Sequence, residues 1–383
     1  MNDMSTSPTS TRRSPWGRLF HGETAIDFYG RRRRFFVVSA ILLVVSFGSL
    51  LARGLELGID FEGGVAWQVP ASSTMDLDAA RAVLDANGVE SSNAKIQKLQ
   101  SASESTIRIQ VGDQSAEVRL AVQNALAERA GVDPQDVSVT SVSSSWGRSI
   151  TEKAVRALVI FLVLVTIYIS WRFEWRMALA AIAAMVHDVL ISVGIYSILQ
   201  LEVTPATVVA FLTILGYSLY DTIVVFDKVQ DNVKHFTGTR VPMGDVVNIS
   251  SNQVLMRSIN TTVSSLLPVL ALLILGAGVF DVTTLREFAF ALLVGMLTGA
   301  YSSLFLATPL LAVLKVREPK YAGLGAGHQT GESLRQMVIS GLPSGARAAR
   351  RVEATEGRPI AAQPESAATV LTHPPRPRKK RRR

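Results

Sequence analysis

The chain has 383 residues, of which 48% are hydrophobic and only 18% are charged, and its formal net charge is +8. A water-soluble protein of this length carries more charge and fewer long apolar runs, so the composition excludes an ordinary soluble globular protein. The chain contains no cysteine, which excludes disulfides and thiolate metal sites. Several apolar runs reach the roughly 18 residues that a transmembrane helix needs.

The N-terminal segment, residues 1–34, is polar and ends in the block Arg31–Arg34. It lacks the pattern of a cleaved signal peptide, so the apolar run over residues 35–52 is predicted to be an uncleaved first membrane helix. Positive charges flank membrane helices mainly on the cytoplasmic side, which places this segment in the cytoplasm.

Residues 53–149 are polar, and acidic side chains outnumber basic ones in this region. Alternating and helical hydrophobic spacings succeed one another in the order β-α-β-β-α-β. That order is typical of a ferredoxin-like α+β domain, here on the extracytoplasmic side. The predicted elements are a strand over residues 58–69 that bends at Gly63-Gly64, helices over 76–86 and 116–130, and strands over 94–99, 106–111 and 136–142.

The chain then returns to the membrane, and residues 150–314 are predicted to hold the second to sixth membrane helices. A basic cytoplasmic loop, residues 228–256, separates the fourth helix from the fifth. In the sixth, Gly295 and Gly299 have the small-xxx-small spacing that lets helices approach closely. The basic tail, residues 315–383, is predicted to be disordered. Six spans with both termini in the cytoplasm satisfy the charge asymmetry of a multi-pass membrane protein.

Asp221 is the most informative residue, because it lies inside the fourth apolar run. An ionisable side chain at membrane depth costs at least ~2.5–3.5 kcal/mol on insertion scales, which makes it a functional-site hypothesis. We interpret Asp221 as a protonable group that couples a proton gradient to movement of the protein. The alternative is a carboxylate near the cytoplasmic interface that pairs with a backbone group or a lysine.

Other polar residues near the apolar runs complete a candidate proton pathway. Arg257 opens the fifth predicted helix, with Asn260 on the same face, and is interpreted as the counter-charge of Asp221. The alternative for Arg257 is an anchor whose side chain snorkels to the lipid headgroups. The full candidate set is Asp221, Arg257, His187, Asp188, Asn260 and Asp227.

His187-Asp188 lies in the third predicted helix, where such a pair is unusual, and is predicted to belong to this pathway. The alternative is a structural histidine with satisfied hydrogen bonds. Adjacent helical residues point about 100° apart, so the two side chains need not touch. Asp227 stands at the membrane edge before Lys228, and an interfacial structural role is favoured for it.

The sequence contains no phosphate-binding loop, metal-ligand cluster or nucleophile–base arrangement. We therefore expect no enzymatic activity, no catalytic residue, no cofactor and no metal. The basic residues that end the chain suit electrostatic attraction to anionic lipid headgroups. The alternative is a solvated tail that fixes topology, and no specific nucleic acid is expected as a partner.

Several motifs between about residues 58 and 314 together resemble the SecD/SecF family of protein-export membrane proteins, and within it the SecF-type subunits. The matching stretches are Gly58-Ile-Asp-Phe-Glu-Gly-Gly64, Tyr168-Ile-Ser-Trp-Arg-Phe-Glu-Trp-Arg176, His187-Asp-Val-Leu190, Gly216-Tyr-Ser-Leu-Tyr-Asp-Thr-Ile-Val-Val-Phe-Asp227, Arg257-Ser-Ile-Asn-Thr261 and Tyr301-Ser-Ser303. Many relatives carry asparagine immediately before the intramembrane aspartate, where this chain has Tyr220. A phenol still donates one hydrogen bond, so the difference bears on local geometry and not on the carboxylate.

The resemblance implies half of a transporter of the resistance-nodulation-division superfamily, namely six helices with an external head. It implies a pseudo-symmetric pair with SecD, joined to the SecY-E-G channel, where SecA drives early translocation of the preprotein. The pair would use the proton-motive force to assist late translocation and release. On the motif match, Asp221 is the family's intramembrane acid and Arg257 is the basic residue that works with it.

Two other functions remain open at this point. A small-molecule or lipid exporter of the same superfamily predicts more than one six-helix half in each chain, or a homodimer. A scaffold that only stabilises translocase assembly requires none of the buried polar groups.

Overall fold

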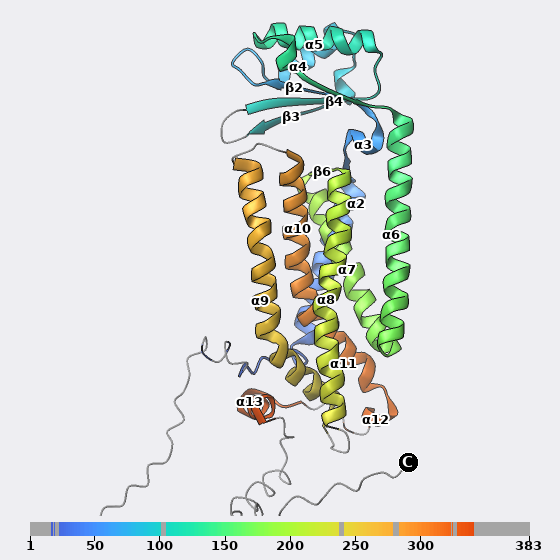
Figure 1. Cartoon of the computed structure of the whole chain (residues 1–383), viewed down its shortest axis with the longest axis vertical. Coiled ribbons are helices and arrows are strands. Elements are labelled where there is room, and N and C mark those ends of the chain that lie inside the picture. The colour runs from blue at the N-terminus through green and yellow to red at the C-terminus, as the bar shows by residue number, and fades with distance from the viewer. Residues whose placement is uncertain are drawn as a thin grey trace, which may run out of the picture.

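The computed structural model describes residues 17, 19, 23–100, 105–236, 241–278, 283–322, 324 and 328–340. Long helices run side by side through one part of the molecule, and a smaller domain with a β-sheet covers one end of them (Figure 1). Short helices gather at the opposite end, next to the chain segments that enter and leave the bundle.

Within the described part of the chain, six helices are long and apolar enough to cross a membrane, which confirms the predicted fold class. The sixth span is a composite of α10, a π-helical turn η3 and α11. The bounds are α2 Arg32–Arg53, α6 Ser144–Arg172, α7 Trp175–Leu199, α8 Pro205–His235, α9 Met243–Gly278, α10 Thr283–Ser302, η3 Ser303–Ala307 and α11 Thr308–Val316.

The spans differ in how much of their surface this chain itself covers. In the most apolar 18-residue stretch of α7 and of the sixth span, 56% of the residues are buried inside the protein. In the corresponding stretches of α2, α6 and α9, only 11% of the residues are buried. Helices α7, α8 and α10 therefore form the interior of the bundle. The others present apolar faces outward, as membrane helices do toward lipid or a partner subunit.

The head domain contains β2 (Gly64–Pro70), β3 (Lys95–Gln100), β4 (Ser105–Val111) and β5 (Ser138–Val142) in the sheet order β3-β4-β2-β5. Its helices α4 (Leu77–Ala86) and α5 (Ala116–Ala130) lie on the face away from the bundle (Figure 1). The order β2-α4-β3-β4-α5-β5 confirms the ferredoxin-like prediction. Its core is built around the fully buried Trp67 on the central strand β2.

The strand predicted over residues 58–69 is wrong in its first half. Residues Ile59–Glu62 form a short helix, α3, and β2 begins only at Gly64. Gly63 and Gly64 separate the two with φ angles of +79° and +128°, which side chains rarely tolerate. A Cβ atom on Gly63 would also lie 2.5 Å from the Cα atom of Ser144, so the turn packs directly on the start of α6.

A two-stranded parallel sheet joins the head to the outer ends of the helices. Strand β1 (Glu56–Leu57) follows α2, and β6 (Glu202–Val203) connects α7 to α8. The fourth span starts at Thr204-Pro205, because Thr204 caps α8 in a capping box with Thr207 and Pro205 is its first residue.

The cytoplasmic predictions need correction in two places. Most of the loop predicted over residues 228–256 is helical, since α8 continues to His235 and α9 begins at Met243. The tail predicted to be disordered from residue 315 is ordered where described: α11 continues to Val316, followed by α12 (Pro319–Ala322) and α13 (Gly331–Ser340). Residues 341–383, including the terminal basic run, lie outside the described residues.

Helix α13 is ordered because it has an apolar face to bury. Leu334, Met337 and Val338 pack into the bundle core at the end opposite the head domain. The N-terminal segment runs alongside α9, where Asn252 donates 2.8 Å to the backbone oxygen of Ile26 and accepts 2.8 Å from its amide. Hydrogen bonds and buried apolar side chains therefore fix both flanking segments against α9.

Candidate functional site

Asp221 lies midway along α8 and is 6% exposed. Two serine hydroxyls donate to its carboxylate, Ser258 of α9 to Oδ1 at 2.7 Å and Ser303 of η3 to Oδ2 at 2.6 Å. Among the described residues, no lysine or arginine is close enough to form an ion pair with it. The buried charge is therefore held by hydroxyl dipoles from two neighbouring spans, where a full negative charge is costly.

Asp188 forms a second buried carboxylate site on α7 and is fully buried. The hydroxyls of Ser218 on α8 and Ser302 on α10 donate to its Oδ2 atom at 2.6 and 2.7 Å. The Nδ1 atom of His187 lies 3.0 Å from its Oδ1 atom, so the two adjacent side chains do meet. Asp188 and Asp221 are thus each bound by two serines from other helices.

The sixth span changes its helical form where it meets these carboxylates. Residues Ser303–Ala307 form a π-helical turn between α10 and α11, and the hydroxyl of Thr308 donates 2.6 Å to the backbone oxygen of Ser303. Single π-turns inside α-helices occur frequently at functional sites. Here the turn places Ser302 toward α7 and its neighbour Ser303 toward α8.

Close helix packing brings the hydroxyls within reach. A Cβ atom on Gly299 would lie 2.8 Å from the Cβ atom of Ser218, and one on Gly295 would overlap the side chain of Ile214. The close approach predicted from the small-xxx-small spacing is confirmed, with α8 as the neighbouring helix.

Arg257, Asn260 and Asp227 make no hydrogen bond or ion pair with either carboxylate among the described residues. Arg257 is exposed on α9 and donates 3.2 Å to the hydroxyl of Tyr220, the residue before Asp221, so the structure brings it beside the acid without an ion pair. Asn260 is exposed on the same helix. Asp227 lies 3.1 Å from Arg172 in a half-exposed pair.

The serine ligands were missed by the sequence reasoning, although Ser218 and the Tyr301-Ser-Ser303 motif stand out in it. A usable signal is the continuation of the glycine spacing, since Ser303 follows Gly295 and Gly299 at the same four-residue interval. A hydroxyl on the face that packs closely against another helix points into that helix.

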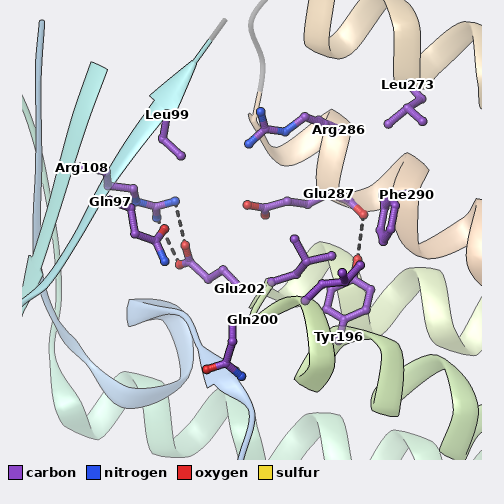
Figure 2. A pocket seen from close by; sticks show the side chains of 12 residues that line it. Gln97, Leu99, Arg108, Tyr196, Gln200, Glu202, Leu273, Arg286, Glu287 and Phe290 are labelled. Carbon is purple, nitrogen blue, oxygen red and sulfur yellow. Dashed lines mark hydrogen bonds and ion pairs between the residues drawn. The ribbon is translucent and has the colours of Figure 1, made fainter. Parts of the chain in front are cut away.

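A cavity of about 420 Å³ lies between the head and the outer ends of the helices. In Figure 2, Arg108 of β4 points at Glu202 of β6, and across the cavity Arg286 and Glu287 project from α10. The Arg108–Glu202 ion pair measures 2.8 Å, and both side chains are largely buried. Tyr196 donates 3.0 Å to the backbone oxygen of Glu287. The Arg108–Glu202 pair therefore links the head to the connection between α7 and α8, and the Tyr196 bond links α7 to α10.

Within the described residues, no group of three or more histidine, aspartate or glutamate side chains could hold a metal ion. The chemistry available to the two buried sites is the binding and release of protons by carboxylates.

Comparisons with known proteins agree with this architecture. Residues 121–317 match the model of the family described as "Protein export membrane protein SecD/SecF, C-terminal". The protein translocase subunit SecF of Streptomyces coelicolor is 39% identical over 93% of this chain and 92% of its own length. SecF of Mycobacterium tuberculosis (strain H37Rv) is 42% identical over 78% of this chain and 69% of its own length.

A solved structure extends the agreement to three dimensions. The crystal structure of SecDF from Thermus thermophilus, a translocon-associated membrane protein, superposes with a TM-score of 0.69 at 33% identity. The match covers 77% of this chain and 39% of that one. The family model, the full-length relatives and the shared fold lead to one conclusion: the chain belongs to the SecD/SecF family of protein-export membrane proteins, on its SecF branch.

Proposed function

We propose that this chain pairs with SecD in the bacterial cytoplasmic membrane and uses the proton-motive force to assist late translocation and release of preproteins. The pair would work at the SecY-E-G channel after SecA has driven the early steps. The names of the relatives support the Sec assignment, and the single-chain SecDF relative, of which this chain matches 39%, supports a SecD partner. Both termini would lie in the cytoplasm.

The observation that carries the proton-driven part is the environment of Asp221. Its carboxylate is buried midway along a membrane span and receives only hydroxyl donors within the described residues. Protonation removes its charge and with it the reason for both serines to point inward. One elementary charge moved across 100 mV changes a free-energy difference by about 2.3 kcal/mol, enough to shift a two-state equilibrium roughly 50-fold.

The face of α8 and α9 around Tyr220 and Arg257 supports a SecD partner at that position. Tyr220 is 51% exposed, and the guanidinium bonded to it is exposed as well. A charged side chain that faces hydrocarbon is costly, so a polar covering is expected there. We propose that SecD supplies it, with Arg257 between the two halves and close to Asp221.

The test is preprotein release from membrane vesicles that contain SecD and this chain, measured with and without a proton gradient. Asp221→Asn is expected to abolish the stimulation by the gradient while membrane insertion remains normal. The matched control is Asp231→Asn, an exposed aspartate on the same helix, which is expected to retain the stimulation. Stimulation that survives Asp221→Asn would favour a scaffold without energy conversion.

Isolation of the complex in mild detergent distinguishes the proposed function from the alternative of a small-molecule or lipid exporter. Co-isolation with SecD is expected. A self-sufficient oligomer of this chain, without SecD, would favour a small-molecule or lipid exporter.

A further inference from the structure

Two adjacent serines connect the two buried carboxylates. Ser302 donates 2.7 Å to Asp188 on α7, and Ser303 donates 2.6 Å to Asp221 on α8. Neighbouring residues of an α-helix point about 100° apart, so one short segment reaches both helices. The segment is the junction at which α10 becomes the π-helical turn.

A second connection runs along α8 itself. Ser218, the other hydroxyl bonded to Asp188, lies three residues before Asp221, and therefore on about the same face one turn away. Hydrogen bonds from Ser302, Ser303 and Ser218, together with the backbone of the sixth span and of α8, thus form a closed ring that contains both acids. The two carboxylates are therefore linked through the same short segments of α8 and of the sixth span.

The charged and titratable groups around this ring are few within the described residues. His187 contacts Asp188 on α7, and the ring of Tyr301 on α10 lies 6.3 Å from that imidazole. On α8 and α9, Tyr220 precedes Asp221 in the chain and accepts a hydrogen bond from Arg257. Since no lysine or arginine forms an ion pair with either acid here, two ionised carboxylates in the ring would repel each other without direct compensation.

Both serines have a second acceptor available. The hydroxyl of Ser302 also lies 3.2 Å from the backbone oxygen of Gly299, and that of Ser303 lies 3.3 Å from the backbone oxygen of Ala300. An ionised carboxylate attracts a hydroxyl more strongly than a neutral carbonyl does. When the carboxylate is protonated, the serine can return to its own helix, at the point where the regular helical hydrogen bonds are interrupted.

We propose that Asp188 and Asp221 share one proton, and that Ser302 and Ser303 transmit its position to the π-helical turn. One of the two aspartates holds the proton on a carboxyl oxygen while the other stays ionised, and no other group is consumed. Each position of the proton leaves a different serine bonded to an ionised acid, so the turn has two arrangements. The inference rests on the proposed function only in treating Asp221 as a site that takes up protons.

The test measures protonation directly and does not depend on translocation. Dicyclohexylcarbodiimide modifies protonated carboxyl groups in membrane interiors, and mass spectrometry of the full chain in complex with SecD reports labelling at each aspartate as a function of pH. Asp188→Asn is expected to move the labelling midpoint of Asp221 by about one pH unit toward lower pH, because the neighbouring charge is gone. By thermodynamic linkage, Asp221→Asn must move the midpoint of Asp188 by the same amount.

Serine variants test the connection itself. Ser302→Ala is expected to move the midpoints of both aspartates, and Ser302→Thr, which keeps the hydroxyl, is expected to restore them. The matched control is Thr298→Val on the same helix, whose hydroxyl donates to the backbone oxygen of Val294 and to neither acid. That control is expected to leave both midpoints unchanged.

The outcomes separate this inference from the proposed function. If Asp188→Asn leaves the Asp221 midpoint unmoved, or Ser302→Ala moves that of Asp188 alone, the shared proton is refuted even if export still requires Asp221. If the midpoints shift reciprocally while Asp221→Asn retains gradient-driven release, the pair stands and the proposed function fails. The conservative Thr and Asn variants keep the test meaningful should an alanine variant fold poorly.

Discussion

A Cβ atom on Gly299 of α10 would lie only 2.8 Å from the Cβ atom of Ser218 on α8, so the two helices leave no room for a side chain at this level. Because the helices approach so closely, the hydroxyls of Ser302 and Ser303 lie within hydrogen-bond distance of the buried acids. Any residue that separates the helices is therefore expected to lengthen the hydrogen bonds to the buried acids.

Gly299→Ala should for that reason destabilise the bundle by about 1–3 kcal/mol, the usual cost of an overpacked interior. The measurement is the midpoint of thermal unfolding of the purified complex. Gly48→Ala is the matched control, because no atom lies within 4 Å of the added Cβ at this glycine of α2. Equal midpoints for the two variants would show that the close approach carries no packing energy.

The ion pair between Arg108 and Glu202 is expected to hold the head domain on the helices. The side chains are 15% and 9% exposed, so Glu202→Gln leaves a largely buried guanidinium without its counter-charge. Loss of one partner from such a pair costs about 3 kcal/mol. Faster amide exchange in β1 and β6 is the expected result, since the Gly58 amide donates to the backbone oxygen of Val203 there.

The matched control for the junction is Asp78→Asn. Asp78 pairs with Arg81 on the surface of the head, where the side chains are 87% and 50% exposed. Exposed pairs contribute little, so exchange in β1 and β6 should stay at its original rate. Unchanged exchange in Glu202→Gln as well would mean that the head is held by other contacts.

The attachment of the N-terminal segment to α9 should depend on pH through Asp27. Burial raises the pKa of this carboxyl, but hydrogen bonds from the Gly30 amide and Asn248 and the nearby His328 outweigh it, so the pKa lies below the usual 3.8. A lowered pKa means that the ionised form stabilises the attachment above about pH 3.8 and that this contribution is lost as the pH falls further.

Asp27→Asn is therefore expected to speed amide exchange at residues 26–30 near neutral pH and to have a vanishing effect in strong acid. Exchange measured by mass spectrometry at both conditions checks this. The opposite pattern, an effect that grows as the pH falls, would contradict the assigned sign.

The sequence predicted the architecture well because its signals are local. Apolar runs define the membrane helices, and the alternation of strand and helix spacings defines the head. The site was predicted as far as single residues reveal it: a carboxylate inside an apolar run is conspicuous in any window. The serines that donate to the carboxylates were not predicted, because serine is unremarkable in a membrane helix. Only the packing of α10 on α8 shows where Ser303 points.

The errors follow the same logic. Residues Ile59–Glu62 alternate between apolar and acidic side chains as a strand does, but the conformations of Gly63 and Gly64 separate them from β2. Helix α13 reads as part of a polar tail, yet its three apolar residues find a surface that only the folded bundle provides. In both places, tertiary contacts override the local pattern.

The central claim is that neutralisation of Asp221 changes how α8 and α9 pack. Because the chain has no cysteine, spin labels can be attached through Val209→Cys and Ile274→Cys, at exposed positions near the outer ends of these helices. Pulsed electron paramagnetic resonance then measures the distance between the labels in the complex with SecD. We predict that the Asp221→Asn variant at neutral pH gives the distance distribution that the protein with Asp221 gives at acid pH. This distribution is displaced from the one that the protein with Asp221 gives at neutral pH. A single distribution, unaffected by pH or by the substitution, would contradict it.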